Sequence, residues 1–338
     1  MLKLMKRKVL SGELALIEEI RRQAGKPSRL VRLGIGDDCA ILKSPKGVEL
    51  LVTTDFSLEG RHFRRDWHSA KSIGHRTLAR GLSDLAAMGG RPIAAFLSVA
   101  LPVSVTGRHG WLDGFLGALT DLANAYGTVL AGGDTSESPT EHVLADIILL
   151  GSAPIGTALR RSGAKPGDDL YCTGSLGGAA AELAELGKSP RRFRGATAVG
   201  DHPHLFPAPR LKTGEALRKR KLATACLDIS DGLSSDLAHL CESSGVRAEV
   251  DVARLPLHPL ARALGVEAGL VAALHGGEDY ELLFTARAGI KMPRMLGGVA
   301  ITRIGRIVAK RKNAPLMMLI GADGARTELT AQGWEHLR

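Results

Sequence analysis

Six short segments that carry carboxylates, most of them beside glycine, interrupt the apolar runs of this 338-residue chain, and we call these segments joints. Aspartate and glycine at such positions are typical of tight turns and helix caps between short elements. Any one of these joints is explained by that structural role alone, whereas six together also suggest a shared chemical site. They are Gly36-Asp37-Asp38, Thr53-Thr54-Asp55, Ser83-Asp84, Gly132-Gly133-Asp134-Thr135, Asp228-Ile229-Ser230-Asp231-Gly232 and Gly276-Gly277-Glu278-Asp279-Tyr280.

Between the joints, residues with strand and helix periodicity are mixed along the whole chain. Because 338 residues exceed the usual size of one core, we expect an α/β (α+β) protein of two domains, residues 1–151 and 152–338, divided near Gly151-Ser152-Ala153-Pro154. Predicted helices are 13–23, 70–88, 106–126, 177–186, 211–222, 233–244 and 266–274. Predicted strands are 31–33, 40–42, 49–54, 93–101, 143–150, 170–173, 225–227, 248–252, 280–285 and 301–307.

Composition excludes several classes of protein. Hydrophobic residues make up 44% and charged residues 24%, which is typical of a globular protein. The longest apolar run, Val143 to Gly156, is too short for a membrane span and contains Asp146. No cleavable leader follows the basic start, so we expect a cytoplasmic protein with no membrane partner. Cys39, Cys172, Cys226 and Cys241 have neither zinc-type nor disulfide spacing, which favours reduced core thiols.

The net charge of +10 raises the alternative of a nucleic-acid-binding protein. Basic clusters occur at residues 191–194, 218–220 and 310–312, but only 4% of residues are aromatic and no recognised binding motif accompanies them. Solvated basic faces are therefore favoured, and nucleic acid is not an expected partner.

Three carboxylates stand out as candidate metal ligands. Asp84 shares its helix face with Thr77, Gly81 and Met88, so it either meets a cation in a packed environment or lies on an exposed face. Asp228 and Asp231 lie between an apolar strand and an apolar helix, where Asp231 could instead cap the helix. Oxygen ligands from several loops suit Mg²⁺. The P-loop, dinucleotide-binding and protein-kinase motifs are absent from the sequence.

Taken in order, these segments resemble the bacterial thiamine-monophosphate kinases along nearly the whole chain. The resemblance includes three further segments, Glu59-Gly60-Arg61-His62-Phe63, Leu82-Ser83-Asp84-Leu85-Ala86-Ala87-Met88-Gly89 and Arg161-Ser162-Gly163-Ala164-Lys165-Pro166-Gly167-Asp168. It implies a two-domain aminoimidazole ribonucleotide synthetase-like fold, a homodimer formed by the N-terminal domains, and a C-terminal domain that completes the substrate site. It also implies direct in-line transfer of a phosphoryl group from ATP to thiamine monophosphate, assisted by several Mg²⁺ ions.

The resemblance assigns roles to individual residues. It implies Mg²⁺ ligation by Asp38, Thr53, Thr54, Asp55, Asp84, Asp134, Asp228 and Asp231. It implies nucleotide contacts by Asp38, Gly133, Arg161 and Ser230, and thiamine-monophosphate contacts by His62, Glu278 and Trp334. No covalent nucleophile or obligatory base is implied, and the sequence leaves a need for K⁺ open. Two kinds of alternative remain. His62, Arg161 and Trp334 could have structural roles only, and the whole protein could be a related ATP-using synthetase or an inactive binding protein.

Overall fold

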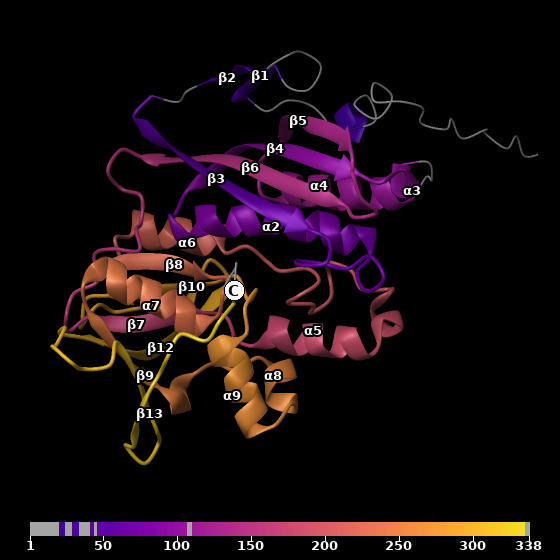
Figure 1. Ribbon diagram of the computed structural model, residues 1–338. Coiled ribbons are helices and arrows are strands. Elements are labelled where there is room, and N and C mark those ends of the chain that lie inside the picture. Colours follow the sequence, from indigo (N-terminus) through magenta and orange to yellow (C-terminus); the bar gives the residue numbers. More distant parts are fainter. Residues whose placement is uncertain (1–19, 24–28, 34–40, 44–45, 107–109, 335–338) are drawn as a thin grey trace, which may run out of the picture. The chain divides into compact units, whose positions relative to one another are not determined.

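The computed structural model describes residues 20–23, 29–33, 41–43, 46–106 and 110–334 (Figure 1). The chain forms two compact units. The first comprises residues within Met1–Lys46, Val52–Gly81 and Pro92–Leu150; the second comprises Gly47–Leu51, Leu82–Arg91 and residues within Gly151–Arg338. The division into domains 1–151 and 152–338 stays a prediction.

The first unit is built on a sheet in the order β3-β6-β4-β5. Strand β6 alternates strictly, with Ala145, Ile147 and Leu149 buried and the residues between them half-buried. Strands β4 and β5 are parallel. A separate ribbon pairs β1 with β2. The bounds are β1 Val31–Leu33, β2 Ile41–Leu42, β3 Val48–Leu58, β4 Arg91–Leu101, β5 Leu130–Glu137 and β6 Leu144–Pro154.

Helix α2 (Ala70–Ala87) packs on this sheet, and α4 (Trp111–Ala125) packs against α2 after the short α3 (Val103–Thr106). One glycine permits the close packing of the two helices. A Cβ at Gly74 would lie 1.9 Å from the Phe115 carbonyl oxygen, whereas one at Gly81 would make only ordinary contact with Ile147 and Leu149 of β6. Gly74 thus lets α2 approach α4 closely.

The second unit is built on a sheet in the order β14-β13-β9-β12-β7-β10-β8, with β11 added beside β12. Its pairs are antiparallel apart from β13 with β9. The bounds are β7 Asp169–Thr173, β8 Ala225–Ile229, β9 Arg247–Asp251, β10 Glu281–Ala286, β11 Met295–Leu296, β12 Val299–Val308, β13 Met317–Ile320 and β14 Arg326–Glu328.

Helix α7 (Leu233–Ser244) packs against β8, β9 and β10, as Figure 1 shows. Its Leu237 and Leu240 join Leu227 and Ile229 in one buried core. Helices α5 (Gly178–Lys188), α8 (Pro259–Ala263) and α9 (Val266–His275) pack on one another, and α6 (Leu211–Lys219) contacts β11. Two 3-10 turns, Pro190–Phe193 and Val252–Arg254, complete the described elements.

The structure confirms the predicted α/β fold class, and helix 233–244 has the expected bounds. Three of the six expected joints were wrong, because they lie inside elements: Thr53 to Asp55 in strand β3, Ser83-Asp84 in helix α2 and Gly132 to Thr135 in strand β5. Gly133 has a φ of 153°, at which a Cβ would point at the paired strand β4 and lie 1.8 Å from the Leu97 carbonyl oxygen. The helix expected at 13–23 falls largely outside the described residues. Cys172, Cys226 and Cys241 are buried and free, as expected, whereas Cys39 is not described.

In the part of the chain that the structure describes, none of the helices has the length and apolar character needed to cross a membrane.

Candidate functional site

The candidate site of the second unit lies at the edge of its sheet where β8 ends and β10 begins. The two strands are antiparallel, with Ile229 opposite Glu281 and Asp228 opposite Leu282. The loop that follows β8 and the loop that precedes β10 are therefore neighbours. This register places Asp228, Ser230 and Asp231 beside Glu278.

Asp228 is buried at the end of β8, and its carboxylate accepts a hydrogen bond from the Ser83 hydroxyl at 2.6 Å. Ser83 is itself fully buried on α2. Asp84, the next residue on that helix, is half-buried. A hydrogen bond of this length fixes the direction of the Asp228 carboxyl group.

The three residues that follow β8 direct their backbone N–H groups at one carboxyl oxygen. Asp236 Oδ2, on the first turns of α7, accepts hydrogen bonds from Ser230, Asp231 and Gly232, each at 3.1 Å. Burial raises the pKa of Asp236 to about 8, repulsion from Asp228 and Asp231 adds to the rise, and the N–H donors oppose it. The three donors offset part of the cost of burying this carboxyl group.

The loop before β10 packs directly on the loop after β8. A Cβ at Gly277 would lie 2.6 Å from the Ser230 carbonyl oxygen, so this position requires glycine. Glu278 and Tyr280 both have positive φ, 68° and 49°. Non-glycine residues rarely adopt this conformation, and where they do it often marks a functional site.

The Glu278 carboxylate is held by a histidine from a distant segment. His204 Nδ1 lies 3.1 Å from Glu278 Oε2, and the His204 side chain is only 1% exposed. Glu182 of α5 in turn accepts the His204 backbone N–H at 2.8 Å and contacts His202 Nδ1 at 2.6 Å. Glu278 thus has a defined orientation at the site edge.

The last described residues, Gln332 to Trp334, lie along the first turn of α7. Gly333 donates its N–H to Ser235 Oγ at 3.0 Å, and Trp334 donates its N–H to the Asp231 carbonyl at 2.9 Å. A Cβ at Gly333 would lie 2.1 Å from that carbonyl oxygen. Trp334 remains 51% exposed, so a large part of its surface can meet a ligand.

Arg161 is not brought to this edge by its backbone. Its carbonyl accepts the Ser244 hydroxyl at 3.1 Å, and Ser244 is the last residue of α7. Asp231 lies at the other end of that 12-residue helix, which spans roughly 18 Å. The Arg161 side chain is exposed.

In the first unit, Thr53, Thr54 and Asp55 lie in the middle of β3. The Asp55 carboxylate accepts a hydrogen bond from Arg80 Nη2 of α2 at 3.0 Å. The Thr54 hydroxyl donates to Asp146 of β6 at 2.8 Å and so points toward the neighbouring strand. Gly133 and Asp134 are exposed residues of β5. Asp38 lies outside the described residues.

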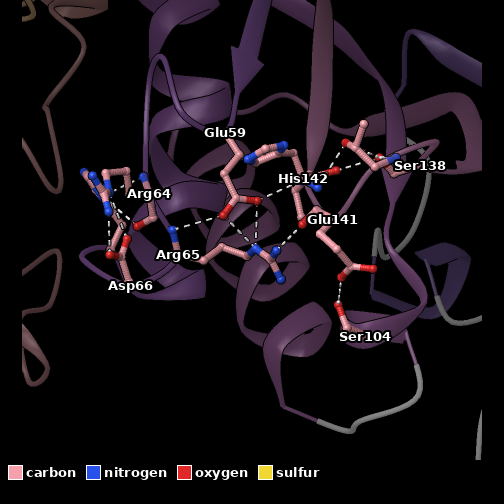
Figure 2. A network of polar contacts seen from close by, with 11 residues as sticks. Glu59, Arg64, Arg65, Asp66, Ser104, Ser138, Glu141 and His142 are labelled. Carbon is pink, nitrogen blue, oxygen red and sulfur yellow. Dashed lines mark hydrogen bonds and ion pairs between the residues drawn. The ribbon is translucent and has the colours of Figure 1, made fainter.

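His62 follows β3 in a tightly bonded turn. Its Nδ1 accepts the Leu58 N–H at 3.0 Å, so the neutral ring carries its proton on Nε2. Figure 2 shows the network that holds the start of this turn: Glu59 accepts Arg65 Nε at 2.7 Å and the Val143 N–H at 2.9 Å, and Arg65 also donates to the Glu141 carbonyl. The position of His62 is therefore set by structure rather than by a ligand.

The candidate Mg²⁺ ligands are divided between the two units. Asp84, Asp228 and Asp231 belong to the second, and Thr53, Thr54, Asp55 and Asp134 to the first. Among the residues with described positions, no group of three or more His, Cys, Asp or Glu side chains could hold a metal ion. The donors are nevertheless all oxygen, which fits Mg²⁺ and not a softer metal.

Three residues that contact the site were not predicted from the sequence. Ser83 stands next to Asp84 in the segment Leu82–Gly89, but only the fold shows that it contacts Asp228. Asp236 carries a usable signal, because an acid in the first turns of a helix often bonds to the preceding N–H groups. No sequence pattern around His204 predicts its contact with Glu278.

Comparison with known proteins assigns this chain to a family. The model for the AIR synthase related protein N-terminal domain matches residues 36–153, and that for the C-terminal domain matches residues 165–314. The chain is thus a two-domain α/β protein of the AIR synthase related class.

Within that class the similarity is specific. The thiamine-monophosphate kinase of Escherichia coli strain K12 is 40% identical over 335 residues, which cover 96% of this chain and 98% of that protein. The thiamine-monophosphate kinase structure from Stenotrophomonas maltophilia K279a has a TM-score of 0.78 at 35% identity, covering 94% of this chain and 98% of that one. The structure of AaThiL complexed with AMPPCP and TMP has a TM-score of 0.73 at 29% identity, covering 96% and 97%. The chain belongs to the thiamine-monophosphate kinase family.

Proposed function

We propose that this protein transfers the γ-phosphoryl group of ATP to thiamine monophosphate and forms thiamine diphosphate and ADP. An oxygen of the acceptor phosphate forms the new P–O bond, while the bond from the γ-phosphorus to the β-phosphate oxygen breaks and its electron pair leaves with ADP. The supporting observation is the sheet edge of the second unit, which gathers five residues predicted for metal, nucleotide and substrate contact: Asp228, Ser230, Asp231, Glu278 and Trp334.

The roles proposed for the substrate-contact residues follow from their chemistry. The Glu278 carboxylate, oriented by His204, suits the positively charged thiazolium ring. The exposed ring of Trp334 provides a surface on which an aromatic ring can stack. His62 is the third residue proposed to contact thiamine monophosphate, although its proton-bearing Nε2 is buried in this structure. No general base is needed, because a phosphate monoester with a second pKa of about 6 is largely ionised at neutral pH.

We propose that Asp84, Asp228 and Asp231, together with Thr53, Thr54, Asp55, Asp134 and Asp38, hold several Mg²⁺ ions, and that Gly133, Arg161 and Ser230 contact the nucleotide. When bound, Mg²⁺ would neutralise the phosphate charges that otherwise keep donor and acceptor apart. The protein contributes fixed carboxylate directions, of which the Ser83–Asp228 bond is the best-defined example.

A homodimer formed through the first unit is part of the proposal. Strand β3 is an edge strand of its sheet, and its Val52 and Phe56 are 66% and 61% exposed. Such an apolar edge favours pairing with a second copy over exposure to water. Light scattering on the purified protein would measure this directly, with Phe56→Asp as the variant expected to dissociate. We also propose that the reaction takes place in the cytoplasm.

The function is tested by incubating the protein with ATP, Mg²⁺ and thiamine monophosphate and separating the products by chromatography. We expect thiamine diphosphate, and we expect an excess of chelator to stop its formation. Thiamine monophosphate left unchanged by a folded, ATP-binding protein would refute the proposal.

A further inference from the structure

The backbone of the loop after β8 is almost entirely occupied by contacts within the protein. Its N–H groups at Ser230, Asp231 and Gly232 all donate to Asp236. Its carbonyl groups accept from the N–H groups of three residues outside the loop: Ile229 from Tyr280 at 2.9 Å, Ser230 from Glu278 at 2.7 Å and Asp231 from Trp334 at 2.9 Å. The loop can therefore offer a ligand its side chains and the second lone pairs of its carbonyl oxygens, but not these N–H groups.

These contacts join elements to which different roles have been assigned. Ser230 and Asp231 are the predicted nucleotide and metal residues, and Glu278 and Trp334 are the predicted substrate residues. Each of the latter pair is bonded through its N–H to a carbonyl of the loop. The orientation of the peptide units between Ile229 and Gly232 consequently sets the backbone positions of both groups of residues.

We infer that Asp236 is a positioning residue that fixes the metal and nucleotide side chains of this loop and, through the loop carbonyls, the backbones of Glu278 and Trp334. The inference deepens the proposed function and rests on it for the assigned roles. Asp236 is only 3% exposed and acts through the peptide units, not by touching a substrate. When three N–H groups lose a shared acceptor, the peptide planes that carry them are no longer held at one angle.

The chemistry of the substituted side chain determines how severe each variant is. Asp236→Ala leaves three N–H groups without their acceptor, and this change also threatens folding. Asp236→Asn is the milder variant, because it keeps one acceptor oxygen of the same size, while its NH2 group replaces the second carboxyl oxygen and competes for the position that faces the three N–H donors. Asp251→Asn is the matched control, because Asp251 also caps a helical turn in this unit by accepting the Ala253 N–H at 3.2 Å, but it contacts no site loop.

Amide hydrogen exchange tests the inference without any need for activity. In Asp236→Asn we expect faster exchange at the amides of Glu278, Tyr280 and Trp334, which Asp236 does not contact, and unchanged exchange at Leu319 in β13. Asp251→Asn should leave all four amides as in the wild type. Equal acceleration throughout the unit, or no acceleration at the three site amides, would overturn the positioning role.

Steady-state kinetics supply the second test. We expect kcat/KM for thiamine monophosphate to fall on the order of 10- to 100-fold in Asp236→Asn, as is typical when the support of a site residue is removed, and to be unchanged in Asp251→Asn. Wild-type kinetics in Asp236→Asn would refute the inference and leave the proposed function standing. A wild-type protein that makes no thiamine diphosphate would refute the proposed function, while the exchange experiment would still decide whether Asp236 controls the loops.

Discussion

Replacing Asp279 with Asn removes a buried carboxyl group whose pKa is raised by burial and lowered by hydrogen bonds. Its oxygens accept the N–H groups of Gly177 at 2.7 Å and Ala179 at 3.1 Å, at the start of α5. Burial raises the pKa of Asp279 to about 7, while these donors lower it and repulsion from Glu281 raises it further. The pH dependence of stability shows which effect dominates.

The sign follows from the two pKa values. The unfolded chain loses this proton near its ordinary pKa of 3.8, whereas the native protein keeps it up to about pH 7. Between these values the native state binds more protons, so the free energy of unfolding falls as pH rises, by about 1.4 kcal/mol per pH unit. From pH 5 to pH 7 the wild type should lose about 2 kcal/mol of stability that Asp279→Asn does not lose.

Urea unfolding of both proteins at pH 5 and pH 7, followed by far-UV circular dichroism, measures this difference. The other titrating groups are common to the two proteins and cancel when the pH dependences are subtracted. If the difference in the free energy of unfolding between wild type and Asp279→Asn stays constant between pH 5 and pH 7, the N–H donors keep the carboxylate ionised. That result would refute the reasoning.

Three further predictions concern the site. Asp84→Asn and Asp231→Asn should each abolish product formation while the circular dichroism spectrum is retained, and near-normal rates would contradict their metal assignment. His204→Gln should raise KM for thiamine monophosphate and leave KM for ATP unchanged, because its ring orients Glu278; equal shifts in both would argue against that role. Gly333→Ala places a Cβ 2.1 Å from the Asp231 carbonyl oxygen and so displaces the C-terminal segment. Calorimetry should then show thiamine-monophosphate binding weakened by up to about tenfold. Unchanged affinity would show that the segment does not contribute to binding.

Local patterns predicted those elements whose periodicity is regular. The apolar spacing in 233–244 gave the bounds of α7, and 70–88 matches α2 within a residue. Strand β5 was missed, because Gly132 and Gly133 suggest a turn when read locally. Both glycines instead face the paired strand β4: a Cβ at Gly133, with its φ of 153°, would lie 1.8 Å from the Leu97 carbonyl oxygen, and one at Gly132 would lie 3.0 Å from the Phe96 ring. Such a contact depends on tertiary packing.

The candidate site shows the same limit. Carboxylates beside glycine can be recognised in the sequence because acidic turns have a local signature. The residues that orient them cannot, since Ser83 lies 145 positions before Asp228 and His204 has no neighbour that signals Glu278. Only the register of β8 and β10 shows which acidic turns lie side by side.

The central claim is direct phosphoryl transfer to thiamine monophosphate, and ³¹P nuclear magnetic resonance of one reaction mixture tests it most directly. With ATP, Mg²⁺ and thiamine monophosphate, we expect the monophosphate signal to be replaced by the two coupled signals of thiamine diphosphate, in equal amount to ADP. Loss of ATP with accumulation of inorganic phosphate, and an unchanged thiamine-monophosphate signal, would contradict the account.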